Sequence, residues 1–221
     1  RWCRSKSSRR FSTTRRVSDK MTDAIVRSHG LEPLVNVISQ SDSGGSGICI
    51  RIDSQVGHLN LRADCSDNDC VEALESQLGQ SLPTTPNTLS EGEHRIYWLG
   101  PDEWLILTDL AQVRLLVEKL RQAADGKHVA LNDVSGGQIA LRLDGTGVRD
   151  LLAKGCTLDL HPRVFTAGMC AQSGLAKANV LIGLAGQAES FDIVVRRSFS
   201  DYLLRWLLQG ADEFGVTIEQ V

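Results

Sequence analysis

The sequence lacks the features that mark several large classes of protein. There is no run of about 18 or more apolar residues, so a transmembrane helix is not expected. No apolar segment follows the basic start, as it would in a secretory signal peptide. No Gly-x-Gly-x-x-Gly fingerprint stands between a strand and a helix, so no nucleotide cofactor is predicted in this chain. We therefore expect a cytoplasmic protein without a membrane segment, whose six cysteines are reduced thiols.

Charge is spread unevenly along the 221 residues. Residues 1–20 carry eight basic residues and one acidic residue, Asp19, which leaves 16 basic and 26 acidic residues and a net charge of −10 for the remainder. A body this acidic repels phosphate backbones, so nucleic acid is not expected as a partner. The basic stretch is either an extension foreign to the native protein, a disordered functional arm or a targeting segment. It is therefore left out of the fold prediction.

Alternating apolar and polar residues predict strands that pair as three hairpins. The hairpins join residues 48–53 to 58–63, 95–99 to 103–108, and 128–134 to 138–144. Two further strand segments follow at 170–184 and 190–197.

A helical pattern follows each strand group, at residues 68–78, 110–124, 148–154 and 199–209. The last helix has Ser198 and Asp201 in a capping-box pattern, with Phe199, Leu203, Trp206 and Leu207 facing the core. Repeated hairpin–helix (ββα) units predict an α+β fold with antiparallel sheets. We expect one domain over residues 21–221, with a division into two lobes near residue 127.

Side chains that could carry chemistry are few. Cys65 and Cys70 form a close pair, but zinc needs about four ligands and no second pair lies at suitable spacing. Cys156, His161 and Cys170 include a thiol and an imidazole that could act together, but no oxyanion-hole motif accompanies them. A thiol enzyme using Cys156 or Cys170 is therefore the least favoured function.

Carboxylates and glycines around the loops have structural explanations. Asp133 precedes a Ser-Gly-Gly turn, where its side chain is expected to accept hydrogen bonds from backbone N–H groups. Asp144 and Asp159 are not expected to act as acid or base. The stretch 41–47 lacks the Lys and Ser or Thr of a phosphate-binding loop, so a flexible loop is predicted there.

Four segments resemble one family and follow the same order along the chain. They are WLGPDEWLIL (Trp98–Leu107), DVSGGQIALRLDG (Asp133–Gly145) and the two parts of the stretch Leu152–Leu207 on either side of a short polar break. Together they resemble the gamma subunit of heterotetrameric sarcosine oxidase, within the aminomethyltransferase-like, folate-binding superfamily. The resemblance implies that superfamily's fold, and a small subunit that stabilises its complex without catalytic, cofactor-binding or metal-binding residues of its own.

The resemblance also implies the chemistry of the whole complex. Sarcosine is oxidatively demethylated to glycine, with formation of H2O2 and formaldehyde, or of 5,10-methylenetetrahydrofolate when tetrahydrofolate is present. The implied partners are alpha, beta and delta subunits, and the implied holoenzyme carries FAD, FMN, NAD and zinc.

One departure from the superfamily concerns folate. Active aminomethyltransferases carry a Gly-Tyr-Thr-Gly-Glu segment at the folate pocket, whereas residues 183–189 here read GLAGQAE, without Tyr or Thr. A free-standing folate-binding protein of the same superfamily is the alternative function, and the missing residues count against it.

The segment from Leu158 to Ala176 is the predicted partner surface. It has few charges, and its Gly, Pro and polar residues interrupt any plain core strand. We expect contacts from His161, Pro162, Phe165 and Met169, with Arg163 as a donor at the rim.

Overall fold

The protein's structure is a computed structural model that describes residue 31, residues 47–186 and residues 190–220. The basic stretch 1–20, and all of the loop 41–47 except Gly47, lie outside the described residues. The elements are, in chain order, β1 (Ile48–Asp53), β2 (Val56–Ala63), α2 (Asn68–Leu78), β3 (Leu89–Glu91), β4 (Arg95–Gly100), β5 (Glu103–Asp109), α3 (Val113–Ala123), β6 (Val129–Asp133), η1 (Ser135–Gly137), β7 (Gln138–Asp144), α4 (Val148–Ala153), β8 (Cys170–Leu175), β9 (Ala178–Ala185), β10 (Ser190–Arg196), α5 (Arg197–Ala211), η2 (Asp212–Phe214) and β11 (Val216–Gln220). No helix among them is long and apolar enough to cross a membrane.

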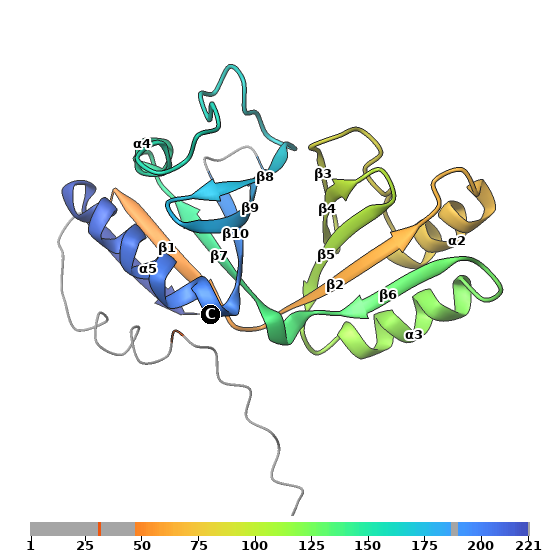
Figure 1. Ribbon diagram of the computed structural model, residues 1–221. Coiled ribbons are helices and arrows are strands. Elements are labelled where there is room, and N and C mark those ends of the chain that lie inside the picture. Colours follow the sequence, from red (N-terminus) through yellow and green to blue (C-terminus); the bar gives the residue numbers. More distant parts are fainter. Residues whose placement is uncertain (1–30, 32–46, 187–189, 221) are drawn as a thin grey trace, which may run out of the picture.

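The strands form two sheets that lie side by side (Figure 1). Sheet A has the order β11-β1-β7-β10-β9-β8, and sheet B has the order β3-β4-β5-β2-β6. Neighbouring described strands run antiparallel, except β1 and β11, which are parallel. The predicted α+β class with antiparallel sheets is confirmed.

Two of the three predicted hairpins are wrong. β1 pairs with β7 and β11 in sheet A, whereas β2 pairs with β5 and β6 in sheet B. The short turn at Ser54 and Gln55 therefore carries the chain from one sheet to the other. The chain crosses back at η1, between β6 and β7. The predicted hairpin of β4 and β5 is present, with a register shift between Trp98 and Gly100.

Buried apolar side chains form three core clusters. α4 and α5 cover one face of sheet A, α2 and α3 cover one face of sheet B, and the two sheets share a core between them. In β5, Trp104 and Ile106 point toward α2 and α3, whereas Leu105 and Leu107 join the core between the sheets. Because both faces are buried, this strand has a nearly continuous apolar sequence.

The helix α2 has the predicted bounds, and its ends have clear causes. The side chain of Asp67 accepts a hydrogen bond from the Cys70 N–H at 3.0 Å, which satisfies one of the N–H groups left free at a helix start. Gly79 ends the helix in the left-handed conformation, with φ of 67°.

The helix α5 corrects two expectations. It begins at Arg197 and has no side-chain cap, so the predicted capping role of Ser198 is wrong. Leu203 and Leu207 are buried as predicted, but Phe199 is 43% exposed. An earlier start places Phe199 in the first turn, outside the buried stripe that packs on sheet A.

Candidate functional site

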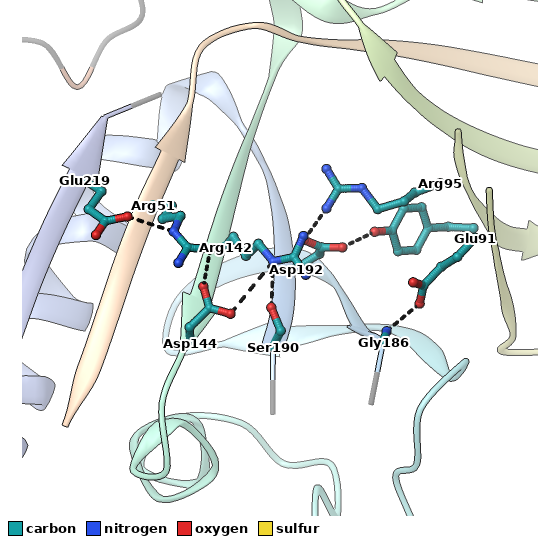
Figure 2. A network of polar contacts seen from close by, with 10 residues as sticks. Arg51, Glu91, Arg95, Arg142, Asp144, Gly186, Ser190, Asp192 and Glu219 are labelled. Carbon is teal, nitrogen blue, oxygen red and sulfur yellow. Dashed lines mark hydrogen bonds and ion pairs between the residues drawn. The ribbon is translucent and has the colours of Figure 1, made fainter. Parts of the chain in front are cut away.

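A row of charged side chains crosses sheet A (Figure 2). Glu219, Arg51, Arg142 and Asp192 occupy paired positions on the neighbouring strands β11, β1, β7 and β10. Side chains alternate between the two faces of a strand, and residues next to these, such as Ile193, belong to the core under the helices. The charged row therefore lies on the face of sheet A opposite α4 and α5.

The outer part of this row is partly exposed. The Nε atom of Arg51 lies 2.8 Å from the Glu219 carboxylate, and its Nη1 atom lies 3.0 Å from Asp144. The Nε atom of Arg142 donates a hydrogen bond to the Ser190 hydroxyl at 2.6 Å. The Arg51 side chain is 41% exposed, so we expect each of these ion pairs to stabilise the fold by less than about 1 kcal/mol.

The inner end of the row is buried and joins the two sheets. The Asp192 side chain is 3% exposed, and its two oxygens are bound separately. Oδ1 lies 2.6 Å from Nη1 of Arg95, and Oδ2 accepts a hydrogen bond from the Tyr97 hydroxyl at 2.5 Å. Arg95 and Tyr97 belong to β4 of sheet B, so both interactions fix one sheet against the other.

The groups around Asp192 are not prepared to transfer protons at neutral pH. Burial, reinforced by the charge of Asp192, raises the pKa of Tyr97 well above its usual value. Burial alone would lower the pKa of Arg95, but Asp192 outweighs it and the net shift is upward. Tyr97 therefore keeps its proton and Arg95 its charge, which suits a structural ion pair and not a general base.

Residues 183–189 stand where active aminomethyltransferases have their folate motif. Side chains of this chain contact the described part of that segment. Gly183 pairs with Asp192, and a Cβ atom added to it would lie 2.5 Å from Cε1 of Tyr97. The glycine is therefore needed for the close approach of the tyrosine ring. Gly186 has a φ of 70°, and its N–H donates to the Glu91 carboxylate at 2.6 Å (Figure 2). Residues 187–189 lie outside the described residues.

His58 is a buried histidine that sequence reasoning missed. It lies on β2, 2% exposed, and neither ring nitrogen has a hydrogen-bond partner among the described residues. The pKa of His58 is lowered to about 4. Burial is the main cause and the positive charge of Arg95 is the second, while the charge of Asp133 opposes the shift. His58 is therefore neutral at physiological pH.

The free energy of unfolding should fall as the pH drops from about 6.5 to about 4. In that window the unfolded chain protonates His58 while the folded chain does not, so protons favour unfolding, by up to about 3 kcal/mol. His58→Leu should flatten the profile measured by urea unfolding. Some dependence should remain, because burial also lowers the pKa of His94.

His161→Leu, which changes an exposed histidine, is the matched control and should keep the wild-type profile. The same loss of free energy in wild type and in His58→Leu would show that His58 is not responsible.

The candidate thiol and imidazole groups have different hydrogen-bond partners in the structure. Cys170 is buried between the sheets, where its Sγ donates to the Thr88 carbonyl at 3.1 Å, and burial raises its pKa to about 12. Cys156 is half-buried, with its Sγ 3.8 Å from the Ser173 hydroxyl. His161 has no hydrogen bond to either thiol in the described part of the chain; its Nδ1 accepts from the Arg163 N–H at 3.2 Å. The buried Cys170 thiol therefore keeps its proton at neutral pH and is not activated as a nucleophile.

The other sequence candidates also have local partners. Asp133 accepts from the Ser135 N–H at 2.9 Å, so its predicted turn role is confirmed. Cys65 Sγ donates to the Pro101 carbonyl at 2.9 Å, whereas Cys70 lies in the core under α2. Within the described ranges, no cluster of three or more His, Cys, Asp or Glu side chains could hold a metal ion.

The loop between α4 and β8 protrudes from one end of sheet A (Figure 1). The predicted contacts His161, Pro162 and Arg163 are exposed there, and Val164 is 52% exposed. Met169 is half-buried, and its sulfur accepts from the Thr166 N–H at 3.4 Å.

Phe165 corrects the predicted contact set. It is 5% exposed and stacks on Phe191, with ring centroids 6.2 Å apart and planes inclined by 14°. Arg149 lies over the Phe191 ring at 5.1 Å and donates to the carbonyl oxygens of Leu160 and Phe165. Phe165 therefore anchors the loop from inside, and the exposed residues 161–164 are left to meet another surface.

The overall arrangement is shared with a known class of enzyme. Aminomethyltransferase T of the glycine cleavage system from Bartonella henselae superposes with a TM-score of 0.58 at 14% identity, over 79% of this chain and 48% of that one. At this identity the likeness concerns the fold, so the chain has an aminomethyltransferase-like fold.

Closer relatives define the family. The model of the sarcosine oxidase, gamma subunit family matches residues 62–213. Sarcosine oxidase subunit gamma of Corynebacterium sp. (strain U-96) is 32% identical over 144 residues, 64% of this chain and 69% of that protein. The counterpart from Corynebacterium sp. (strain P-1) is 29% identical over 86% of this chain and 92% of its own length. A chain of the heterotetrameric sarcosine oxidase from Corynebacterium sp. U-96 superposes with a TM-score of 0.77 at 26% identity, over 86% of this chain and 97% of that one. This chain belongs to the sarcosine oxidase gamma subunit family.

Proposed function

We propose that this chain is the gamma subunit of a heterotetrameric sarcosine oxidase and that it stabilises the assembly without holding a cofactor. The observation that carries the proposal is the superposition on a chain of heterotetrameric sarcosine oxidase over 97% of that chain's length. A relative of nearly the same extent, assembled with other subunits, favours the same role for this protein.

The described site supports a structural role. Asp192, the most deeply buried carboxylate of the row, is bound on both oxygens by Arg95 and Tyr97. The backbone of Gly183 and Gly186 is engaged by Tyr97 and Glu91, where a folate-binding relative would present its pocket motif. These contacts favour a subunit without folate of its own over a free-standing folate-binding protein.

The chemistry belongs to the partner subunits in this proposal. The alpha, beta and delta subunits hold FAD, FMN, NAD and zinc and supply the site for tetrahydrofolate. The complex oxidises the N-methyl group of sarcosine and reduces O2 to H2O2, and the one-carbon unit leaves as formaldehyde or as 5,10-methylenetetrahydrofolate.

The exposed loop residues 161–164 are the proposed contact with the alpha subunit. Phe165 and Arg149 hold the loop from the inside, so the contact residues are ordered before assembly. A preordered loop loses less conformational entropy on association than a flexible one.

The isolated chain should bind no flavin and produce no peroxide from sarcosine, because its sequence has no nucleotide-binding fingerprint and the buried carboxylate of Asp192 is bound on both oxygens by Arg95 and Tyr97. The measurement is flavin absorbance and a peroxide assay on the purified chain, with the assembled four-subunit complex as the positive control. Stoichiometric flavin on the single chain would contradict the proposal.

A further inference from the structure

A cleft of about 500 Å³ opens between the two sheets, around the end of β10. Its apolar lining includes Leu105, Leu181 and Val194 from the core between the sheets, each exposed by 6% or less. Polar side chains complete the lining: Gln138, Gln172, Ser173, Asn179 and Arg196. The cleft lies near the end of β10 that is opposite to Ser190, so it is separate from the ion pairs of the charged row.

The charge of the cleft is carried by one residue. Arg196 is the single charged side chain among the twelve lining residues, and it is exposed. It forms no ion pair with any residue in the described ranges. A guanidinium with unused donors beside apolar side chains can bind a planar anionic group that is attached to an apolar body.

We propose that this cleft binds a small organic anion, a carboxylate or a sulfonate with an apolar body. The anionic group pairs with Arg196, and the apolar body lies on Leu105, Leu181 and Val194. The Gln172 amide already donates to the Leu99 carbonyl at 3.0 Å, which fixes one wall of the site. A volume of about 500 Å³ is in the range of ordinary small-molecule sites. The site does not depend on the gamma-subunit function.

Gly174 offers a way to fill the cleft without disturbing the fold. It lines the cleft, and a Cβ atom added to it meets no atom within 4 Å. Gly136 has the same open surroundings and lies outside the cleft lining. Neither glycine has a positive φ, so both accept a larger residue without backbone strain.

The test uses the full chain and two probes, 3-phenylpropionate and its uncharged amide, 3-phenylpropionamide. Binding is followed by titration calorimetry and by the amide NMR signal of the residue at position 174. The carboxylate should bind saturably and at least about tenfold more tightly than the amide, since a charge-assisted hydrogen bond contributes roughly 1.5–3 kcal/mol.

Variants then locate the site. Arg196→Gln should weaken carboxylate binding about tenfold or more, and Gly174→Leu should abolish binding of both probes. Arg114→Gln, at a side chain on α3 that is 92% exposed, and Gly136→Leu are the matched controls and should bind as wild type does, with melting temperatures close to that of wild type. Absence of saturable carboxylate binding at about 10 mM, or equal binding to wild type and Gly174→Leu, would overturn the proposal.

Discussion

Asp192→Asn is expected to lower the free energy of unfolding by about 3–5 kcal/mol. The substitution removes the charge that neutralises buried Arg95, and it points an amide N–H₂ group at a neighbour that is itself a donor. For a domain of this size, the melting temperature should fall by roughly 10 °C. Urea and thermal unfolding of the purified chain measure both quantities.

Asp201→Asn is the matched control. Asp201 also pairs with an arginine, Arg205 at 3.0 Å, but its side chain is 55% exposed whereas that of Asp192 is 3% exposed. We expect a change within about 0.5 kcal/mol for Asp201→Asn. Equal losses for the two variants would show that Asp192 does not act through burial between the sheets.

Val164→Asp is expected to reduce incorporation of the chain into its complex at least about tenfold. A carboxylate buried at an interface without a partner costs well over the roughly 1.4 kcal/mol that a tenfold change represents. The isolated chain should keep its melting temperature, because Val164 is 52% exposed. The measurement is a quantitative pull-down on a tagged alpha subunit after co-expression of the four subunits.

Two comparisons separate assembly from folding. Leu115→Asp changes an equally exposed apolar residue on α3, 55% exposed, and should assemble normally. Phe165→Asp should instead unfold the region around the loop, because it places a charge against Phe191 in the core. Normal assembly of Val164→Asp would rule out the loop as the contact surface.

Local features of the fold could be read from the sequence. The hairpin of β4 and β5 and the helix α2 depend on a turn, a cap and a periodicity that lie within a few residues of each other. The strands with which β1 and β2 pair could not be predicted from such local signals. A short turn between two alternating strands predicts a hairpin, but here β1 pairs with β11, more than 160 residues later in the chain.

The buried ion pair was missed for the same reason. Arg95 and Asp192 lie 97 positions apart, and nothing in the sequence around either residue indicates that the other is its partner. One signal was available: Asp192 interrupts the apolar run FDIVV, and a carboxylate in a buried strand needs a partner. Phe165 was predicted wrongly because a loop rich in Gly and Pro was expected to expose its aromatic residue. In the structure, the Phe165 ring is buried and stacks on the ring of Phe191.

Purification of the protein from its native host, under conditions that preserve complexes, tests whether this chain is a sarcosine oxidase subunit. We expect a yellow complex in which this chain migrates with three other subunits in equal amounts and which produces peroxide from sarcosine. A colourless monomer, recovered without partners from cells that oxidise sarcosine, would contradict it.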